Sequence, residues 1–267
     1  MQTRPLMKSK KHTTERSSEN KSFNCPICKD TGWALKSIEG QYDYYGECVC
    51  GLRQKQILES KKSFANIPET FKYMRLKDFR TDIYTKDENK AVVEKSVKAI
   101  QYWLENIETM RNRGMGLYIA SNAKGSGKTR IAASVANELV EKGISTLFAT
   151  SVSIITEIKT SWEKDSANTE NQLLNDLSRA DVLVIDDFGT ERESDWVNEK
   201  FYQIINNRYV GKKITIFTSN SRLNDLRYDE RIKNRIKETT FQVPFPEESV
   251  RDIIAKENME ELLRAIR

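Results

Sequence analysis

The sequence contains a single histidine, His12, which lies in a charged segment at the start of the chain. Acid–base chemistry in the folded part must therefore use carboxylates, lysine, tyrosine or cysteine. Long apolar runs are missing too, since none approaches the roughly 18 residues that span a bilayer. The first residues lack the apolar core of a secretory signal. We therefore expect a cytoplasmic protein without a membrane partner.

Internal repeats and low-complexity tracts are also absent. The 267 residues suit one large domain, or a domain of about 150 residues with a smaller attachment. The net charge is a modest +5, and the first 22 residues hold six Lys or Arg against two Glu. We expect residues 1–21 to form a disordered basic tail that keeps the chain in solution, with contact to nucleic acid as the alternative.

Cysteine is absent after residue 50, and the four cysteines form two close pairs: Cys25 with Cys28, and Cys48 with Cys50. Disulfides are disfavoured in the cytosol, so such pairs are typical of metal ligands. Four thiolates can surround Zn²⁺ as a tetrahedron and leave no open position, which makes the role structural. The alternative is four free thiols.

The segment between the pairs looks like a β-hairpin that brings the cysteines together. Strand-like residues 31–38 and 42–47 flank a turn-prone Glu39-Gly40. A module of about 30 residues cannot bury enough surface to fold alone, whereas zinc binding can supply ~10–16 kcal/mol. We therefore predict that residues 22–55 form a zinc-binding module.

An alternating α/β pattern begins near residue 115. A helix at residues 91–107 is expected to pack on this region. Strands without alternation, separated by helices, predict a parallel sheet buried on both faces, with ligands at its carboxyl edge. The predicted strands are 116–120, 145–150, 182–187 and 213–220, and the predicted helices are 129–142, 151–162, 171–179 and 195–210.

The stretch SNAKGSGKT, residues 121–129, follows the first strand and precedes a helix, as a phosphate-binding loop does. Only the first glycine of the usual pattern is missing, and Asn122 stands there. We expect Asn122 to replace it in a left-handed conformation. Lys128 would reach the β- and γ-phosphates and Thr129 would ligate Mg²⁺. The predicted ATP-binding residues here are Asn122, Ala123, Lys124, Gly125, Ser126, Gly127, Lys128, Thr129 and Arg130.

Two aspartates end the apolar run VLVIDD. Asp186 is placed to hold Mg²⁺, directly or through water, and to join the nucleotide-binding set. Asp187 is the best candidate for the base that polarises the attacking water, because the folded part has no histidine. A polar strand end in a turn is the alternative, and the phosphate loop 57 residues earlier argues against it.

At these residues the chain resembles AAA+ ATPases, and more narrowly the bacterial and phage DnaC/DnaI helicase loaders. The resemblance covers about residues 22–260. It rests on CPICKDTGW, NIPETF, KGSGKTRIAASVANEL, VLVIDDFGTE, SDWVNEKFYQIINNRYV, TIFTSN and DERIKNRI. It implies an α/β AAA+ P-loop fold, with a parallel sheet flanked by helices and preceded by a small four-cysteine zinc module.

The resemblance also implies three roles. Asn220 matches sensor 1, which holds the attacking water or the γ-phosphate. Arg235 matches the arginine finger that acts on a neighbouring subunit, and Arg251 matches sensor 2 in its own subunit. Without the family, a solvated helix charge would be favoured for both arginines.

Two departures from the AAA+ pattern matter. Asn122 replaces a glycine, and the acidic pair is Asp186-Asp187 where many AAA+ proteins have Asp-Glu. Hydrolysis is therefore expected to be slow, although loaders of this family commonly carry the Asp-Asp form. Sixteen residues follow Arg251, so we expect a minimal lid and an ATPase that depends on its neighbours.

The leading hypothesis is an ATP-dependent loader of the hexameric replicative DNA helicase. The zinc module would bind the helicase, and the AAA+ domain would bind ATP and single-stranded DNA and self-associate. Lys159, Trp162 and Lys164 are candidate DNA contacts, with packing as the alternative for Trp162. The expected domains are a helical linker at 56–110 and the ATPase domain at 111–267.

Three other functions remain open. A transposition helper ATPase like IstB shares this AAA+ type, but the zinc module argues against it. A nucleotide-gated adaptor or inhibitor would bind a helicase without turnover. A small-molecule kinase is disfavoured, because no segment supplies an acceptor pocket and lid.

Overall fold

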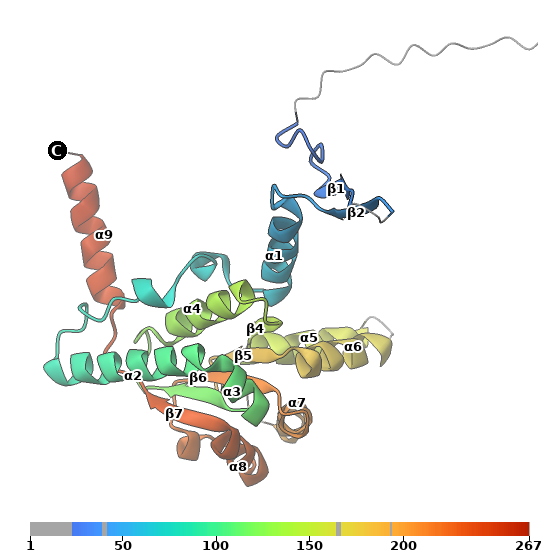
Figure 1. The fold of residues 1–267 in the computed structure, drawn as a ribbon. Coiled ribbons are helices and arrows are strands. Elements are labelled where there is room, and N and C mark those ends of the chain that lie inside the picture. The colour runs from blue at the N-terminus through green and yellow to red at the C-terminus, as the bar shows by residue number, and fades with distance from the viewer. Residues whose placement is uncertain (1–22, 39–41, 164–166, 193, 267) are drawn as a thin grey trace, which may run out of the picture. The chain divides into compact units, whose positions relative to one another are not determined.

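The computed structural model describes residues 23–38, 42–163, 167–192 and 194–266, drawn as a coloured ribbon in Figure 1. The chain divides into two compact units, Met1–Gln56 and Ile57–Arg267. The predicted basic tail at 1–21 and the predicted turn Glu39-Gly40 lie outside the described residues.

In the first unit, the predicted hairpin is confirmed. Strand β1 (Trp33–Lys36) pairs antiparallel with β2 (Tyr44–Glu47), so that Trp33 lies opposite Glu47. Helix α1 (Leu52–Ala65) begins two residues after Cys50. Because the two strands are antiparallel, the end of β2 lies beside the start of β1. The two cysteine pairs, which flank the hairpin, therefore meet there.

The second unit is built on a five-stranded sheet with the order β4-β5-β6-β3-β7. Every pairing in it is parallel, as the continuous apolar runs predict. Its strands are β3 (Gly116–Ala120), β4 (Thr146–Thr150), β5 (Val182–Asp186), β6 (Ile214–Ser219) and β7 (Thr240–Pro244).

Strand β7 is missing from the sequence prediction. Its residues TFQVP do not form an apolar run, and they follow directly on the highly charged helix α8 (Glu230–Thr239). It pairs with β3 at the edge of the sheet, where Pro244 is tolerated. Its position matters because the chain leaves β7 beside the phosphate loop.

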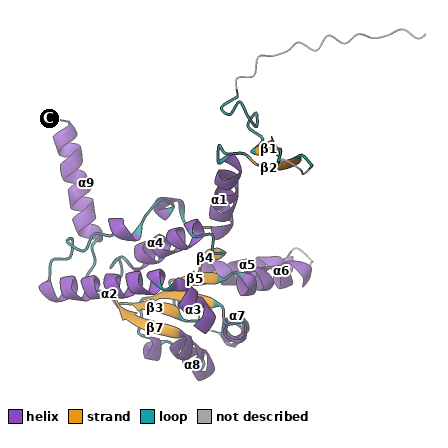
Figure 2. Ribbon diagram, in the orientation of Figure 1, coloured by secondary structure: helices purple, strands orange, loops and turns teal. Residues whose placement is uncertain are grey.

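Helices cover both faces of the sheet, as the layers in Figure 2 show. Leu117 and Ile119 of β3 face one apolar cluster, and Tyr118 between them faces the other. The first cluster includes α2 (Asp87–Glu105), α3 (Ile107–Arg113) and α4 (Lys128–Glu141), and the second includes α5 (Ser151–Glu163), α6 (Ala167–Arg179), α7 (Asp195–Val210) and α8.

Arg208 of α7 is buried in the second unit and joins three elements. Its guanidinium donates hydrogen bonds to the carbonyls of Leu177, Ala180 and Ile214, and its Nε donates to Thr215 Oγ1 at 3.0 Å. Burial lowers its pKa to about 9. The cation thus satisfies carbonyls at the end of α6 that the helix cannot bond itself.

Short 3₁₀ turns, η1 (Glu69–Phe71) and η2 (Leu76–Asp78), precede α2, and η3 (Leu223–Asp225) follows β6. The last helix, α9 (Arg251–Ala265), has no buried residue, although Ile254 packs partly against the first cluster. Within the described residues, no helix combines the length and apolarity needed to cross a membrane.

Candidate nucleotide-binding site

The phosphate loop lies between β3 and α4, at the carboxyl edge of the sheet. Gly125 and Gly127 have φ values of +79° and +94°, which non-glycine residues rarely adopt. A Cβ at Gly127 would lie 3.2 Å from Phe79 Cζ and from Tyr84 Oη. Both positions therefore need glycine, and the loop is closely covered by neighbouring segments.

Asn122 does not take the left-handed conformation predicted for it. The described non-glycine residues with positive φ are Lys29, Asp30, Asn66, Asp187 and Lys212. The loop therefore turns at Asn122 without a glycine-like backbone. Its amide instead donates to Glu247 Oε1 at 3.1 Å, an acceptor supplied from far along the chain.

Lys128 is buried, and its ammonium is held against the loop. Its Nζ donates to Ser121 O at 3.2 Å, Ala123 O at 2.9 Å and Ser126 Oγ at 3.2 Å. Burial lowers the pKa of Lys128, opposed mainly by the nearby negative charges of Asp187 and Glu247. An ammonium in this position is available to the phosphates that such loops bind.

Thr129 and Asp186 meet, as the predicted magnesium site would require. Thr129 Oγ1 lies 3.0 and 3.1 Å from the two carboxylate oxygens of Asp186, and Thr218 Oγ1 donates to Oδ1 at 2.5 Å. Burial raises the pKa of Asp186, and the charge of Asp187 adds to the shift. A hydroxyl and a carboxylate at this spacing suit the oxygen ligands that Mg²⁺ takes.

Asp187 and Asn220 also come together. Asn220 Nδ2 donates to Asp187 Oδ1 at 3.5 Å, and Asp187 has a φ of +54°. The backbone amide of Asp187 donates to Thr218 Oγ1 at 2.9 Å, which holds this unusual backbone in place. Asp187 was predicted as the base, and Asn220 was predicted to hold the attacking water or the γ-phosphate. The two residues directly follow neighbouring strands and face each other.

Arg251 lies over the phosphate loop from the first turn of α9. A Cβ added at Gly125 would be 2.9 Å from Arg251 Cδ, and the charge of Arg251 contributes to lowering the pKa of Lys128. Arg130, in contrast, points to the segment before α2. Its guanidinium lies 5.8 Å from the Phe79 ring and donates to Asp78 O at 3.1 Å.

A model of the IstB-like ATP binding protein family matches residues 86–233, more than half of the chain. The chain belongs to this family. Together with the sheet topology and the assembled site, this places the IstB-like chain among ATPases with the AAA+ P-loop fold.

Named relatives of this IstB-like protein are linked to DNA replication and to a phage-like element. The replicative helicase loader DnaC of Escherichia coli K12 is 35% identical over 122 residues, 45% of this chain and 49% of that protein. The chain thus matches about half the length of this relative. Protein XkdC of the phage-like element PBSX of Bacillus subtilis is 26% identical over 242 residues, which cover 88% of this chain and 85% of that protein.

A solved structure has the same fold. The crystal structure of the DnaC helicase loader superposes with a TM-score of 0.57 at 25% identity, and covers 67% of this chain and 99% of that chain. The predicted fold class is therefore confirmed for the IstB-like domain.

Arg235 contacts α7 and not the phosphate loop of its own chain. It lies on α8 against α7, where its Nε donates to Asn206 Oδ1 at 3.0 Å. Its guanidinium carbon is 5.0 Å from the Tyr202 ring and 5.3 Å from the Tyr209 ring. Its predicted action on a neighbouring subunit stays a prediction.

The four cysteines of the first unit converge. Their sulfur atoms lie within 4.8 Å of one another, with Cys25 to Cys48 at 3.7 Å and Cys28 to Cys50 at 3.6 Å. A tetrahedron with Zn–S bonds of about 2.3 Å has edges of about 3.8 Å. The donor set therefore fits zinc, and Asp30 accepts the Asn24 and Cys25 amides that shape the first pair.

Thr218, Glu247 and Tyr84 are site residues that sequence reasoning missed. Thr218 lies two residues before Asn220, and its position in the strand-end stretch TIFTSN was the available signal. Tyr84 donates its hydroxyl to Ser126 O at 2.8 Å from the segment before α2. No local pattern marks Tyr84 or Glu247, because both reach the loop through tertiary contacts.

Proposed function

We propose that this chain is an ATP-dependent loader of a replicative DNA helicase. The observation that carries the proposal is the cluster of contacts at the phosphate loop, made by Lys128, Thr129, Asp186, Asp187 and Asn220, in a chain similar to a protein named as a helicase loader. The similarity covers half of that relative, so the partner is inferred from it together with the N-terminal unit.

ATP with Mg²⁺ would supply the phosphoanhydride whose hydrolysis drives release. Lys128 and the glycine-shaped loop bind the phosphates, and Thr129 and Asp186 hold the metal. Asp187 accepts a proton from water that Asn220 orients, which is consistent with their 3.5 Å contact. Arg235 would stabilise the transition-state charge in an adjacent subunit, so turnover would depend on self-association.

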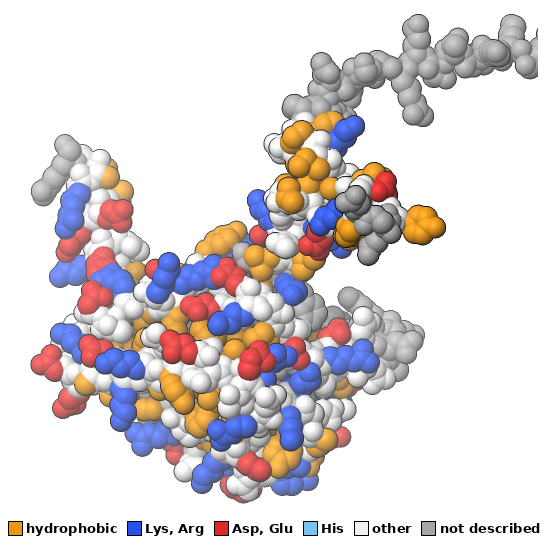
Figure 3. Space-filling model, viewed as in Figure 1, with side chains coloured by type: hydrophobic (Ala, Val, Ile, Leu, Met, Phe, Trp, Pro, Cys, Tyr) orange, Lys and Arg blue, Asp and Glu red, His pale blue; other side chains and the backbone are white. Residues whose placement is uncertain are grey.

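The N-terminal unit is the proposed helicase-binding module. Zinc held by the four cysteines would order it, since the core cluster there consists of three cysteines and Ala34. Large apolar side chains remain exposed on its surface, as the orange atoms of this unit show in Figure 3. They include Ile27, Leu35, Tyr42, Tyr45 and Val49. Exposed apolar groups on so small a unit support a protein-binding role.

Single-stranded DNA is proposed to bind beside α5. Lys159 is exposed, and its ammonium lies 5.4 Å from the ring of Trp196 on α7. A cation beside an aromatic ring is the combination used for phosphates and bases. The side chain of Trp162 and the whole of Lys164 lie outside the described residues, so their predicted roles remain predictions.

The first experiment measures the ATPase rate with and without single-stranded DNA, together with capture of the purified replicative helicase. The intact chain should hydrolyse ATP faster with DNA and should retain the helicase, and removal of residues 1–56 should abolish capture. Lys128→Ala should lose ATP binding but keep helicase capture. Equal ATP affinity in Lys128→Ala would overturn the nucleotide site.

Other outcomes would assign another function. DNA-stimulated turnover without helicase capture favours a transposition helper, in line with the family that matches residues 86–233. Helicase capture without turnover favours a nucleotide-gated adaptor. In that case Asp187, which is shorter than glutamate, becomes the first residue to test.

A further inference from the structure

Residues 245–250, which connect β7 to α9, run alongside the phosphate loop and bond to it at several points. Ser121 Oγ donates to Pro246 O at 2.7 Å, and Val250 N donates to Gly125 O at 3.1 Å. Between these contacts, Glu247 Oε1 accepts from Asn122 N at 3.1 Å and Oε2 from Ala123 N at 3.0 Å. One carboxylate thus takes up two backbone donors of the loop.

The carboxylate of Glu247 is a negative charge placed where phosphate binds. Its charge opposes the effect of burial on the pKa of Lys128, so the two groups are close. The lysine of such a loop reaches the β- and γ-phosphates. Glu247 therefore lies where the γ-phosphate of a triphosphate would add negative charge. The carboxylate and that phosphate would repel each other.

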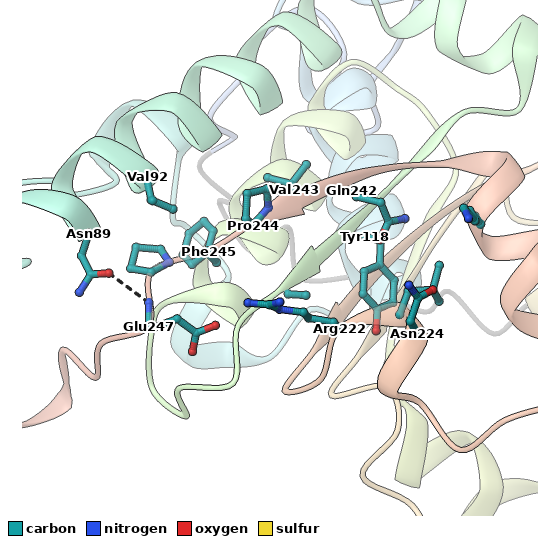
Figure 4. Close-up of a pocket in the computed structure, with 14 residues that line it drawn as sticks. Asn89, Val92, Tyr118, Arg222, Asn224, Gln242, Val243, Pro244, Phe245 and Glu247 are labelled. Carbon is teal, nitrogen blue, oxygen red and sulfur yellow. Dashed lines mark hydrogen bonds between the residues drawn. The ribbon is translucent and has the colours of Figure 1, made fainter.

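Glu247 also borders a cavity of about 420 Å³, whose lining residues are shown in Figure 4. Arg222 and Lys237 line the same cavity, and in Figure 4 the guanidinium end of Arg222 points toward Glu247. Among the described residues, Arg222 is exposed and its side chain has no hydrogen bond or ion pair. The cavity thus offers Glu247 both space and a cation.

The backbone of Glu247 is held while its side chain is exposed. Glu247 N donates to Asn89 Oδ1 at 3.3 Å, and the next residue, Glu248, accepts from Thr85 and Asn89. A rotation of the Glu247 side chain therefore requires no movement of the segment. The carboxylate also accepts from Ser121 Oγ at 3.3 Å and from Asn122 Nδ2 at 3.5 Å. Exchanging these donors and the two loop amides for the Arg222 guanidinium keeps the carboxylate paired before and after the rotation.

We propose that Glu247 discriminates between ATP and ADP, because its carboxylate pairs with the loop amides in one state and with Arg222 when a γ-phosphate binds. This inference rests on the proposed ATP site and adds a specificity-determining residue to it. The ADP complex keeps Glu247 on Asn122 and Ala123. The ATP complex places it in the cavity, and Arg222 offsets the loss of its hydrogen bonds to the loop.

The test measures binding of a non-hydrolysable ATP analogue and of ADP to the full chain by calorimetry. Glu247→Gln removes the charge but keeps an acceptor oxygen, so it should raise the analogue-to-ADP affinity ratio about tenfold, a usual size of coupling between groups. ADP affinity should stay within about twofold of the starting value. A purely structural role for Glu247 would change both affinities together and leave the ratio unmoved.

Arg222→Gln should lower the same ratio, and it should have no effect in the Glu247→Gln background, because the two residues act as a pair. Lys237→Gln is the matched control, since it removes a cation from the same cavity, and the ratio should not change. An unchanged ratio in Glu247→Gln, or equal effects of the Lys237 and Arg222 changes, would overturn the inference. If the unaltered chain bound neither nucleotide, the proposed function itself would fail.

Discussion

The Thr218 hydroxyl joins the two strands that carry the catalytic candidates, because it donates to Asp186 Oδ1 at 2.5 Å and accepts from Asp187 N at 2.9 Å. Thr218 lies on β6 two residues before Asn220, and both aspartates end β5 or follow it directly. A single buried hydroxyl therefore links the carboxylate of Asp186, the proposed metal ligand, to the backbone of Asp187, the candidate base, two residues before Asn220.

Asp186→Asn should stabilise the protein while damaging its site. Burial and the charge of Asp187 raise the pKa of Asp186, so its ionised form costs folding free energy. We expect the unfolding midpoint without nucleotide to rise by about 2–4 °C. Stabilisation by Mg²⁺ with ATP should disappear. Thermal unfolding with and without both ligands measures this, with the exposed Asp225→Asn as control.

The same substitution should change how stability depends on pH. A raised pKa means that folded Asp186 holds a proton that the unfolded chain has released, so its contribution falls as pH rises through the window above the ordinary value of 3.8. The stability gain of Asp186→Asn should therefore grow across that window and then level off. Urea titrations from about pH 4 to about pH 8 test this, and a constant difference would contradict the shift.

Arg235→Ala should leave ATP affinity intact and abolish DNA-stimulated hydrolysis. The side chain is held by Tyr202, Tyr209 and Asn206, and it makes no contact with the phosphate loop of the same chain. Arg231→Ala is the matched control, because Arg231 also lies over Tyr202, at 4.7 Å, but pairs with Asp229. Normal stimulated turnover in the Arg235 variant would remove this residue from the site.

Zinc removal should unfold the first unit and spare the second. Cys48→Ser, or a chelator added to the intact chain, should abolish helicase capture and make the segment around β1 and β2 sensitive to protease. ATP affinity should persist, because the phosphate loop belongs to the other compact unit. Elemental analysis should find one zinc in the unaltered chain. Its absence from protein that still captures the helicase would argue for free thiols.

Arg208→Ala should destabilise the second unit by at least about 3 kcal/mol, because it leaves buried carbonyls without donors. The affected groups are the carbonyls of Leu177, Ala180 and Ile214. Arg179→Ala, on the exposed face of α6, should change the unfolding free energy by less than about 0.5 kcal/mol. Chemical denaturation of the two variants compares them directly, and similar midpoints would rule out the proposed role of Arg208.

The phosphate loop and the aspartate pair were predictable because each is a short local pattern between a strand and a helix. Asn220, Arg235 and Arg251 followed only from the family resemblance. The prediction for Asn122 was wrong, because local preference suggested a left-handed backbone while Glu247 supplied a different solution from 125 residues away. Strand β7 was missed for a related reason, since a partly buried edge strand that ends in Pro244 shows no continuous apolar run.

Helix α9 brings Arg251 to the phosphate loop, yet none of its residues is buried, and Arg80 holds its outer part through two hydrogen bonds to Glu257. A helix of 15 residues with so little packing is marginal in water. Its amide hydrogens should exchange with solvent far sooner than those of α4. Local melting of this one weakly held helix would therefore remove Arg251 from the phosphate loop while the sheet stays folded.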